Sequence, residues 1–95
     1  MVSIASLVLE IRIEHAQSLK DKRQVIKSLK DRLRARFNVS VAETEFQNLW
    51  QLSEVVVVSA GSSRQVVENT LRQVEDEATR QLAGGLAGAN MEWLV

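Results

Sequence analysis

MVSIASLVLEIRIE, residues 1–14, sets the architecture of this chain, because its apolar side chains occupy alternate positions. One side of the alternation consists of Ala5, Leu7, Leu9, Ile11 and Ile13, and the other of Ile4, Ser6, Val8, Glu10, Arg12 and Glu14. A period of two over this length predicts a β-strand with one buried face. The rest of the chain must therefore supply elements that cover this face.

The segment after this strand predicts an amphipathic helix. Ser18 is expected at the N-cap, with Asp21 three residues later as a weaker form of the capping box. Side chains then recur at spacings of three and four: Leu19, Lys22, Ile26, Leu29, Leu33 and Phe37. This spacing places them on one helix face. Asn38 suits the left-handed position that ends a helix.

Four further segments are predicted between the first helix and the Gly84–Gly88 connection. They are a strand over about 39–46, a loop over 47–51, a third strand centred on Val55–Val58, and a second helix that begins near Ser62 and buries Val67, Leu71, Val74 and Ala78. Ser62 and Gln65 have the spacing of a capping box. The connection Gly84–Gly88 is expected to be mobile, and 90–95 to form the last strand.

The predicted order is β-α-β-β-α-β within one domain, residues 1–95. The compact solution is an α+β ferredoxin-like sandwich, with a four-stranded antiparallel sheet and both helices on one face. Right-handed crossovers place the first and third strands at the centre of the sheet. A KH-type arrangement is the main alternative, but no GxxG lies between two helices here.

The composition limits the classes of protein to which this chain can belong. The chain is 45% hydrophobic and 25% charged, which is typical of a globular protein. It has no apolar run near the ~20 residues that span a bilayer, and residues 1–14 lack the pattern of a signal peptide. It has no cysteine, and no residue cluster with metal-ligand spacing. We therefore expect a cytoplasmic protein with no membrane segment, metal or cofactor.

Basic residues are concentrated in one segment although the whole chain is neutral. Ser18–Arg36 holds eight of the 12 Lys and Arg residues and only two acidic ones, so it has a net charge of +6 and the remainder of the chain −6. At about 100° per residue, five cations fall on one side of the predicted helix: Lys20, Arg23, Lys27, Lys30 and Arg34. We call these five the basic stripe. Lys22, Arg32 and Arg36 are expected on the opposite flank.

Two features of the basic stripe favour an anion-binding site over a solvated helix face. Intrahelical pairing is nearly absent, since Lys27 with Asp31 is the main available pair. Lys20 and Arg23, together with Lys22, lie in the first turn, where the helix dipole disfavours cations by about 0.3–1 kcal/mol each. The solvated face and an acidic protein partner remain the alternatives. Because the two central strands have no aromatic residue, RNA recognition is expected to use backbone phosphate and shape.

Three stretches resemble a known family. They are Ser18-Leu19-Lys20-Asp21-Lys22-Arg23, Arg36-Phe37-Asn38-Val39-Ser40-Val41-Ala42-Glu43 and Leu49-Trp50-Gln51. Together they are similar to the small bacterial YlxP-like proteins, a domain family of unknown function. Asn48 departs from the family pattern, which has an acidic residue in this loop. The resemblance implies a ferredoxin-like domain whose gene often lies beside genes for translation initiation and ribosome maturation; it implies no reaction, cofactor or catalytic residue.

Other residues give weaker indications. His15 is the only histidine and has no assignable nucleophile beside it, so we expect a surface residue rather than a general base. Glu75, Asp76 and Glu77 are expected to be solvated. Trp50 either packs over the end of the sheet or anchors a contact with a partner. Ile4 and Val8 fall on the sheet face that the helices leave open, and either Val55 with Val57 or Val56 with Val58 must join them.

The sequence therefore predicts a non-enzymatic binding module. The first hypothesis for its function is association with structured RNA or a ribosomal assembly through the basic stripe. The alternative is a protein–protein interaction module or homodimer that uses the open sheet face, with Ile4, Val8 and Trp50 as interface residues. An enzyme ranks last.

Overall fold

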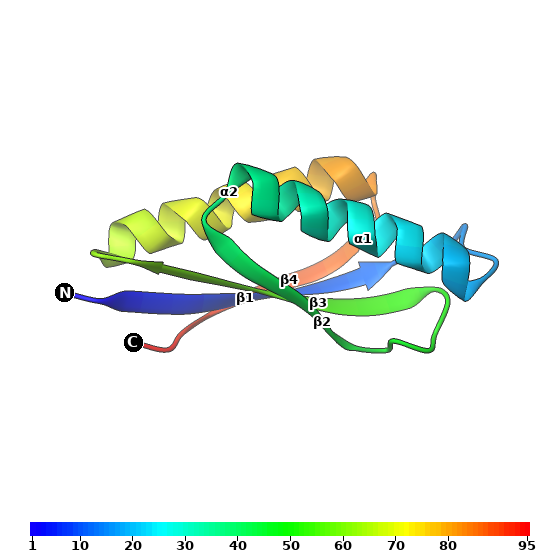
Figure 1. Ribbon diagram of the computed structural model, residues 1–95, viewed down its shortest axis with the longest axis horizontal. Coiled ribbons are helices and arrows are strands. Elements are labelled where there is room, and N and C mark those ends of the chain that lie inside the picture. Colours follow the sequence, from blue (N-terminus) through cyan, green and yellow to red (C-terminus); the bar gives the residue numbers. More distant parts are fainter.

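The computed structural model describes residues 1–95. Six elements follow one another: β1 (Ser3–Arg12), α1 (Leu19–Arg36), β2 (Val39–Glu45), β3 (Leu52–Gly61), α2 (Arg64–Leu82) and β4 (Leu86–Trp93). The strands form one sheet in the order β2-β3-β1-β4, with every neighbouring pair antiparallel. Both helices lie on one face of this sheet (Figure 1). The predicted ferredoxin-like sandwich, with the first and third strands at its centre, is confirmed.

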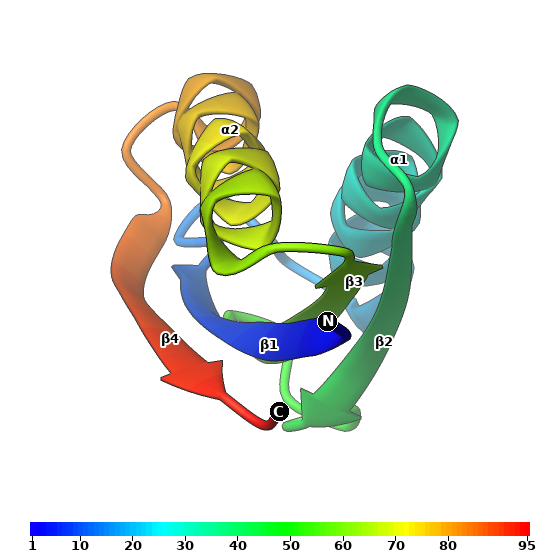
Figure 2. The same ribbon diagram turned by 90° about the vertical axis from the view of Figure 1, so that its left-hand side faces the viewer.

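The alternation along β1 has the expected effect on packing. The side chains at Ala5, Leu7, Leu9, Ile11 and Ile13 are all buried, and they face the helices. Figure 2 shows α1 above the β2 and β3 side of the sheet and α2 above the β1 and β4 side. The helices contribute the buried side chains of Ile26, Leu29, Leu33, Val67, Leu71, Val74 and Ala78. One core therefore lies between the helix layer and the sheet.

The opposite face of the sheet is open to solvent. Val55 and Val57 are fully buried in the core, so Val56 and Val58 are the pair on the open face. The β1–β3 register places Val56 directly opposite Val8, and Val58 opposite Ser6. Ile4, Val8, Val56 and Val58 are each only partly exposed. We call these four residues the open-face patch.

Two helix ends differ from the sequence prediction. Asn38 is not left-handed, because α1 ends with Phe37 in extended backbone (φ −131°) and the chain enters β2 directly. The second helix begins one residue later than predicted, since Ser63 is the N-cap and its Oγ accepts the Val66 N–H at 3.2 Å. Ser18 is the N-cap of α1 as predicted, and its Oγ accepts the Asp21 N–H at 3.1 Å.

The last strand begins earlier than predicted. Ala83 and Gly84 take left-handed backbone conformations (φ 48° and 93°) that end α2 and reverse the chain. β4 then starts at Leu86, and the Arg12 N–H donates to the Gly85 carbonyl at 2.8 Å. Gly84–Gly88 is therefore largely ordered structure: a tight reversal and the first residues of an edge strand. The glycines suggested mobility, whereas they permit close packing against β1. No helix in the chain is both long enough and apolar enough to cross a membrane.

Candidate nucleic-acid interface

The basic stripe lies along the outer side of α1, beside the edge strand β2. Lys20, Arg23, Lys27 and Arg34 are exposed, and Lys30 is partly exposed. The side chains of four of these residues line a shallow groove of about 340 Å³ together with Ile26, Asp31 and Glu43. The structure therefore places the five predicted residues on one face, as the helix spacing indicated.

Pairing within the basic stripe is sparse. Lys27 Nζ lies 2.6 Å from Asp31 Oδ2, and this hydrogen bond lowers the pKa of Asp31. Arg34 donates from Nη2 to the neutral Val41 carbonyl at 2.7 Å, which fixes its side chain against β2 without compensating its charge. Lys20, Arg23 and Lys30 form no ion pair. Six Lys and Arg side chains in the chain have no carboxylate within 4.0 Å, and four of them belong to the stripe.

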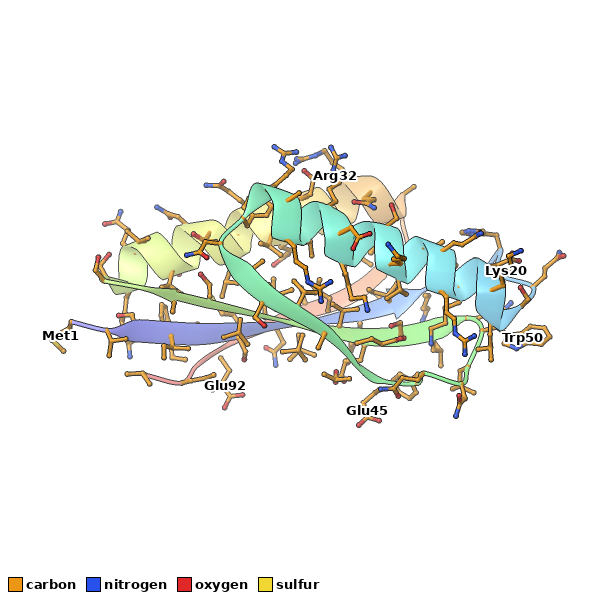
Figure 3. The ribbon with its side chains drawn as sticks, in the orientation of Figure 1. Met1, Lys20, Arg32, Glu45, Trp50 and Glu92 are labelled. Atoms are coloured by element: carbon orange, nitrogen blue, oxygen red, sulfur yellow. The ribbon has the colours of Figure 1, made fainter.

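The opposite flank of α1 is organised differently. Arg32 Nε lies 3.0 Å from Glu77 Oε2, Arg36 also pairs with this carboxylate, and Arg80 Nη2 lies 3.4 Å from Glu77 Oε1. Burial by itself raises the pKa of Glu77, but the hydrogen bonds and charges of the arginines outweigh it, so the pKa lies below its ordinary value. Arg32 points away from the sheet at the top of the helix layer (Figure 3).

Glu77 corrects one sequence expectation. Its side chain is only 4% exposed, whereas the segment Glu75–Glu77 was expected to be solvated. Glu77 lies three residues after the buried Val74 and beside the buried Ala78, so the helical period brings it to the seam between α1 and α2. The charges of this segment indicated solvent exposure, whereas the helical period of α2 places Glu77 toward α1.

The burial of Lys22 corrects a second expectation from the sequence. It was expected on the flank with Arg32 and Arg36, but its side chain is only 1% exposed. Lys22 Nζ lies 3.0 Å from Glu43 Oε2 and donates to the Phe46 carbonyl, and Ser53 Oγ donates to the same Glu43 oxygen at 2.6 Å. The sequence signal for this burial was present, since Lys22 falls in the apolar series that includes Ile26 and Leu29. Its charge is therefore used inside the protein and is not available to a partner.

The β2–β3 loop is tied to the segment between β1 and α1 by several contacts. The Gln51 carbonyl accepts the Ile13 N–H at 2.9 Å, and Gln51 Nε2 donates to the Glu14 and Ala16 carbonyls at 3.2 and 3.4 Å. Together with the contacts of Lys22 to Glu43 and Phe46, these bonds hold the β2–β3 loop against the start of α1 and the segment before it. Lys20 and Trp50 both lie at this end, opposite Met1 (Figure 3).

The remaining predicted site residues take separate positions. Trp50 is 51% exposed and lies on the loop, not over the core. Ile4 and Val8 lie in the open-face patch, on the other side of the sheet from α1. His15 is exposed and, with Arg12, Gln81 and the Gly84-Gly85 turn, lines a hollow of about 540 Å³. No set of three or more His, Asp or Glu side chains is arranged to hold a metal ion.

The arrangement defines a ferredoxin-like domain with an uncompensated basic helix face. Residues 4–88 match the protein family described as "Protein of unknown function (DUF503)". The chain belongs to this family. It is 38% identical over 65 residues to the Uncharacterized protein YlxP of Bacillus subtilis (strain 168), an alignment that covers 68% of this chain and 71% of that protein. The YlxP-like resemblance seen in the sequence is confirmed.

Similar solved structures support the fold alone. The de novo designed protein Foldit4 has a TM-score of 0.60 at 10% identity, over 100% of this chain and 98% of that one. SnoaB, a cofactor-independent oxygenase from Streptomyces nogalater, has a TM-score of 0.56 at 12% identity, over 97% and 91%. A C-terminal segment of the alpha subunit of aIF2 from Pyrococcus abyssi has a TM-score of 0.55 at 15% identity, over 98% and 49%. One fold thus serves a designed protein, an oxygenase and a segment of the alpha subunit of aIF2.

Proposed function

We propose that this protein is a non-enzymatic cytoplasmic module that binds structured RNA, alone or in a ribosomal assembly, through the basic stripe. The observation that supports this most directly is the charge imbalance along α1. Four cations of the stripe lack a carboxylate partner, whereas Lys22, Arg32 and Arg36 on the same helix are all ion-paired. A helix selected only for stability would pair its exposed cations within the chain.

The geometry of the stripe suits a polyanion. From Lys20 to Arg34 the helix rises by about 21 Å at ~1.5 Å per residue, so a single RNA strand can place several phosphates along it. Arg34 is held in position by the Val41 carbonyl at 2.7 Å, which lowers the side-chain entropy lost on binding. Phosphate contacts of this kind contribute affinity and orientation, without sequence information.

The test is a salt-dependent binding titration of the full chain with a fluorescently labelled RNA stem–loop. Replacing Lys20, Arg23 and Lys27 together with Gln should weaken binding by more than tenfold. It should also flatten the slope of log affinity against log salt, because each lost phosphate contact removes roughly 0.7–0.9 from that slope. These side chains flank the core rather than fill it, so the fold should survive.

A charge-matched control separates the stripe from general charge. Arg12, Arg64 and Arg72 are exposed and lie off α1, and changing them together to Gln alters net charge by the same amount. This control should keep most of the affinity. The proposal is rejected if the unmutated protein does not bind RNA at about 50 mM salt, where electrostatic binding is strong, or if the control loses as much affinity as the stripe variant.

A second candidate function, self-association, is favoured by the open-face patch. Its residues come from the two central strands and are adjacent in register. β3 has valines on both faces from Val55 to Val58, a pattern typical of strands that are buried on both sides. A self-complementary surface most commonly forms a two-fold dimer. The occupant proposed for this face is a second copy of the chain.

Sedimentation tests the self-association proposal. Val8→Lys places a charge in the middle of the open-face patch and should convert a dimer to monomer. A dimer that survives this change would pair instead through the edge strands β2 or β4. A single 10.6 kDa species of the unmutated protein at tens of micromolar would reject self-association.

A further inference from the structure

The β2–β3 loop displays apolar surface that the core does not use. Phe46, Leu49 and Trp50 are 43%, 48% and 51% exposed. The other large apolar side chains with comparable exposure are Val66 and residues at the two chain ends. Asn48, Leu49, Trp50, Gln51 and Leu52 line a shallow hollow of about 540 Å³ on this loop. We call these five residues the loop platform.

The loop platform is held in place by the rest of the protein. Phe46, two residues before it, has a left-handed backbone (φ 63°), which is unfavourable for a side chain of this size. The buried Lys22 compensates by donating to the Phe46 carbonyl, and the Leu49 N–H donates to that carbonyl at 3.0 Å. At its other end, Gln51 is bonded to residues 13–16. A surface that is fixed before binding loses little entropy when it binds.

The charges around the loop platform indicate what it binds. No residue from Phe46 to Ser53 is charged, although Glu45 and Glu54 flank this segment. Lys20 and Arg23, from the first turns of α1, have no ion pair, and Lys20 lies at the same end of the molecule as Trp50 (Figure 3). Figures 1 and 2 agree that this end of α1 lies above the β2–β3 loop. An aromatic ring at the same end of the molecule as unpaired cations matches a nucleotide, which has an aromatic base and an anionic phosphate.

Asn48 adds a polar group of the right kind. Its side chain makes no hydrogen bond within the chain, in contrast to the side chain of Gln51. A carboxamide can donate to and accept from a base edge at the same time. The amide therefore complements an unpaired base better than an apolar protein segment.

We propose that Trp50 stacks on one unpaired base of the bound RNA, while the phosphates of the adjoining strand lie on the basic stripe. This inference rests on the proposed RNA-binding function and specifies its ligand: a helix or strand with a bulged, looped or terminal nucleotide at the end nearest Trp50. It departs from the sequence expectation, which was recognition by backbone phosphate and shape rather than by unstacked bases. The stacking surface is Trp50, which lies outside the sheet, and the open sheet face takes no part in it.

The experiment compares two RNAs with the same number of phosphates: a blunt duplex, and a stem with one unpaired nucleotide. Affinity is measured with fluorescently labelled RNA, and quenching is measured with the full chain carrying Trp93→Phe, in which Trp50 is the only tryptophan. The RNA with the unpaired nucleotide should quench Trp50 emission and bind about tenfold more tightly than the duplex, as expected for one stacked base. Trp50→Ala should reduce this preference to near unity, and Trp50→Phe should keep most of it.

A control variant and two different negative results separate the stacking proposal from the proposed RNA-binding function. Leu94 has a similar exposed fraction, 54%, at the chain end remote from the loop, and Leu94→Ala should leave the preference unchanged. If both RNAs bind equally and neither quenches Trp50, the stacking proposal is wrong while the proposed RNA-binding function stands, and the platform would then suit a protein partner. If neither RNA binds, the proposed function itself fails.

Discussion

Lys22 and Glu43 form a buried ion pair, 3.0 Å between Nζ and Oε2, that joins the start of α1 to the middle of edge strand β2. Lys22 is 1% exposed and Glu43 16%. Each partner has a second contact, since Lys22 also donates to the Phe46 carbonyl and Glu43 also accepts from Ser53 Oγ. The pair thereby connects the basic helix, the sheet and the β2–β3 loop in one network.

Removing one partner of the Lys22–Glu43 ion pair should lower the free energy of unfolding substantially. Lys22→Met keeps most of the length of the side chain but leaves the Glu43 carboxylate without its cation and the Phe46 carbonyl without this donor. We expect the free energy of unfolding to fall by about 3–5 kcal/mol, measured by urea denaturation. The double variant Lys22→Met with Glu43→Gln should be less destabilised than the sum of the two single changes, because no unpaired buried charge remains. A Lys22→Met protein as stable as the parent would contradict this account of the network.

The buried face of α1 gives a second prediction. Leu29 is fully buried between α1 and the sheet, so Leu29→Ala removes packed atoms and leaves a cavity. The expected loss in the free energy of unfolding is about 2–5 kcal/mol, a large part of the ~5–15 kcal/mol typical of a small domain. Gln24→Ala, at an exposed position of the same helix, should change it by less than about 0.5 kcal/mol. Equal melting temperatures for the two variants would show that Leu29 is not in the core.

The fold was predictable because two periods determine it. The alternation in β1 identified the face that the helices cover, and the three-and-four spacing in α1 identified Ile26, Leu29 and Leu33 as its partners. The residues that mark helix ends were less reliable predictors. Ser62 and Ser63 can each cap a helix, and the path of the backbone out of β3 makes Ser63 the N-cap of α2. Asn38 could take a left-handed conformation, but α1 leads straight into β2 and requires extended backbone there.

The candidate site was predicted only in part, for a different reason. The positions of Lys20, Arg23 and Lys27 follow from helix geometry, which a sequence contains. The pairing of Lys22 with Glu43 and of Arg32 with Glu77 joins residues far apart in the chain, and depends on how α1 lies against β2 and α2. A count of local charges therefore overestimated how many cations are available to a partner.

Two glycines near the start of β4 should differ in how much a methyl group destabilises the protein. A Cβ at Gly85 would lie 2.6 Å from the Arg12 carbonyl oxygen, which is backbone, whereas a Cβ at Gly88 would meet only the side chain of Glu10, which is exposed and can rotate. Gly85→Ala should lower the free energy of unfolding by about 1–3 kcal/mol, and Gly88→Ala should change it by less than about 0.5 kcal/mol. Thermal unfolding of the two variants side by side decides this, and equal losses would place the β1–β4 contact elsewhere.

Glu77 should make the stability of the protein depend on pH in the acidic range. Its pKa in the folded protein is held below the ordinary value of 4.5, so the unfolded chain takes up the proton first as pH falls. The stabilisation is therefore fully present above about pH 4.5 and is lost as pH falls through the lower folded pKa. Glu77→Gln should be less stable than the parent at pH 7, because Arg32, Arg36 and Arg80 lose their shared carboxylate.

The difference in unfolding free energy between parent and Glu77→Gln should shrink as the pH is lowered from 5 toward 3, measured by urea denaturation at each pH. Asp31 also has a lowered pKa, but it lies on the other flank of α1 and is present in both proteins, so it cancels in the comparison. Glu75→Gln is the matched control, because Glu75 is an exposed carboxylate on the same helix with no ion pair; its curve should run parallel to that of the parent. A Glu77→Gln difference that stays constant over this range would mean that the arginines do not hold Glu77 in its charged form.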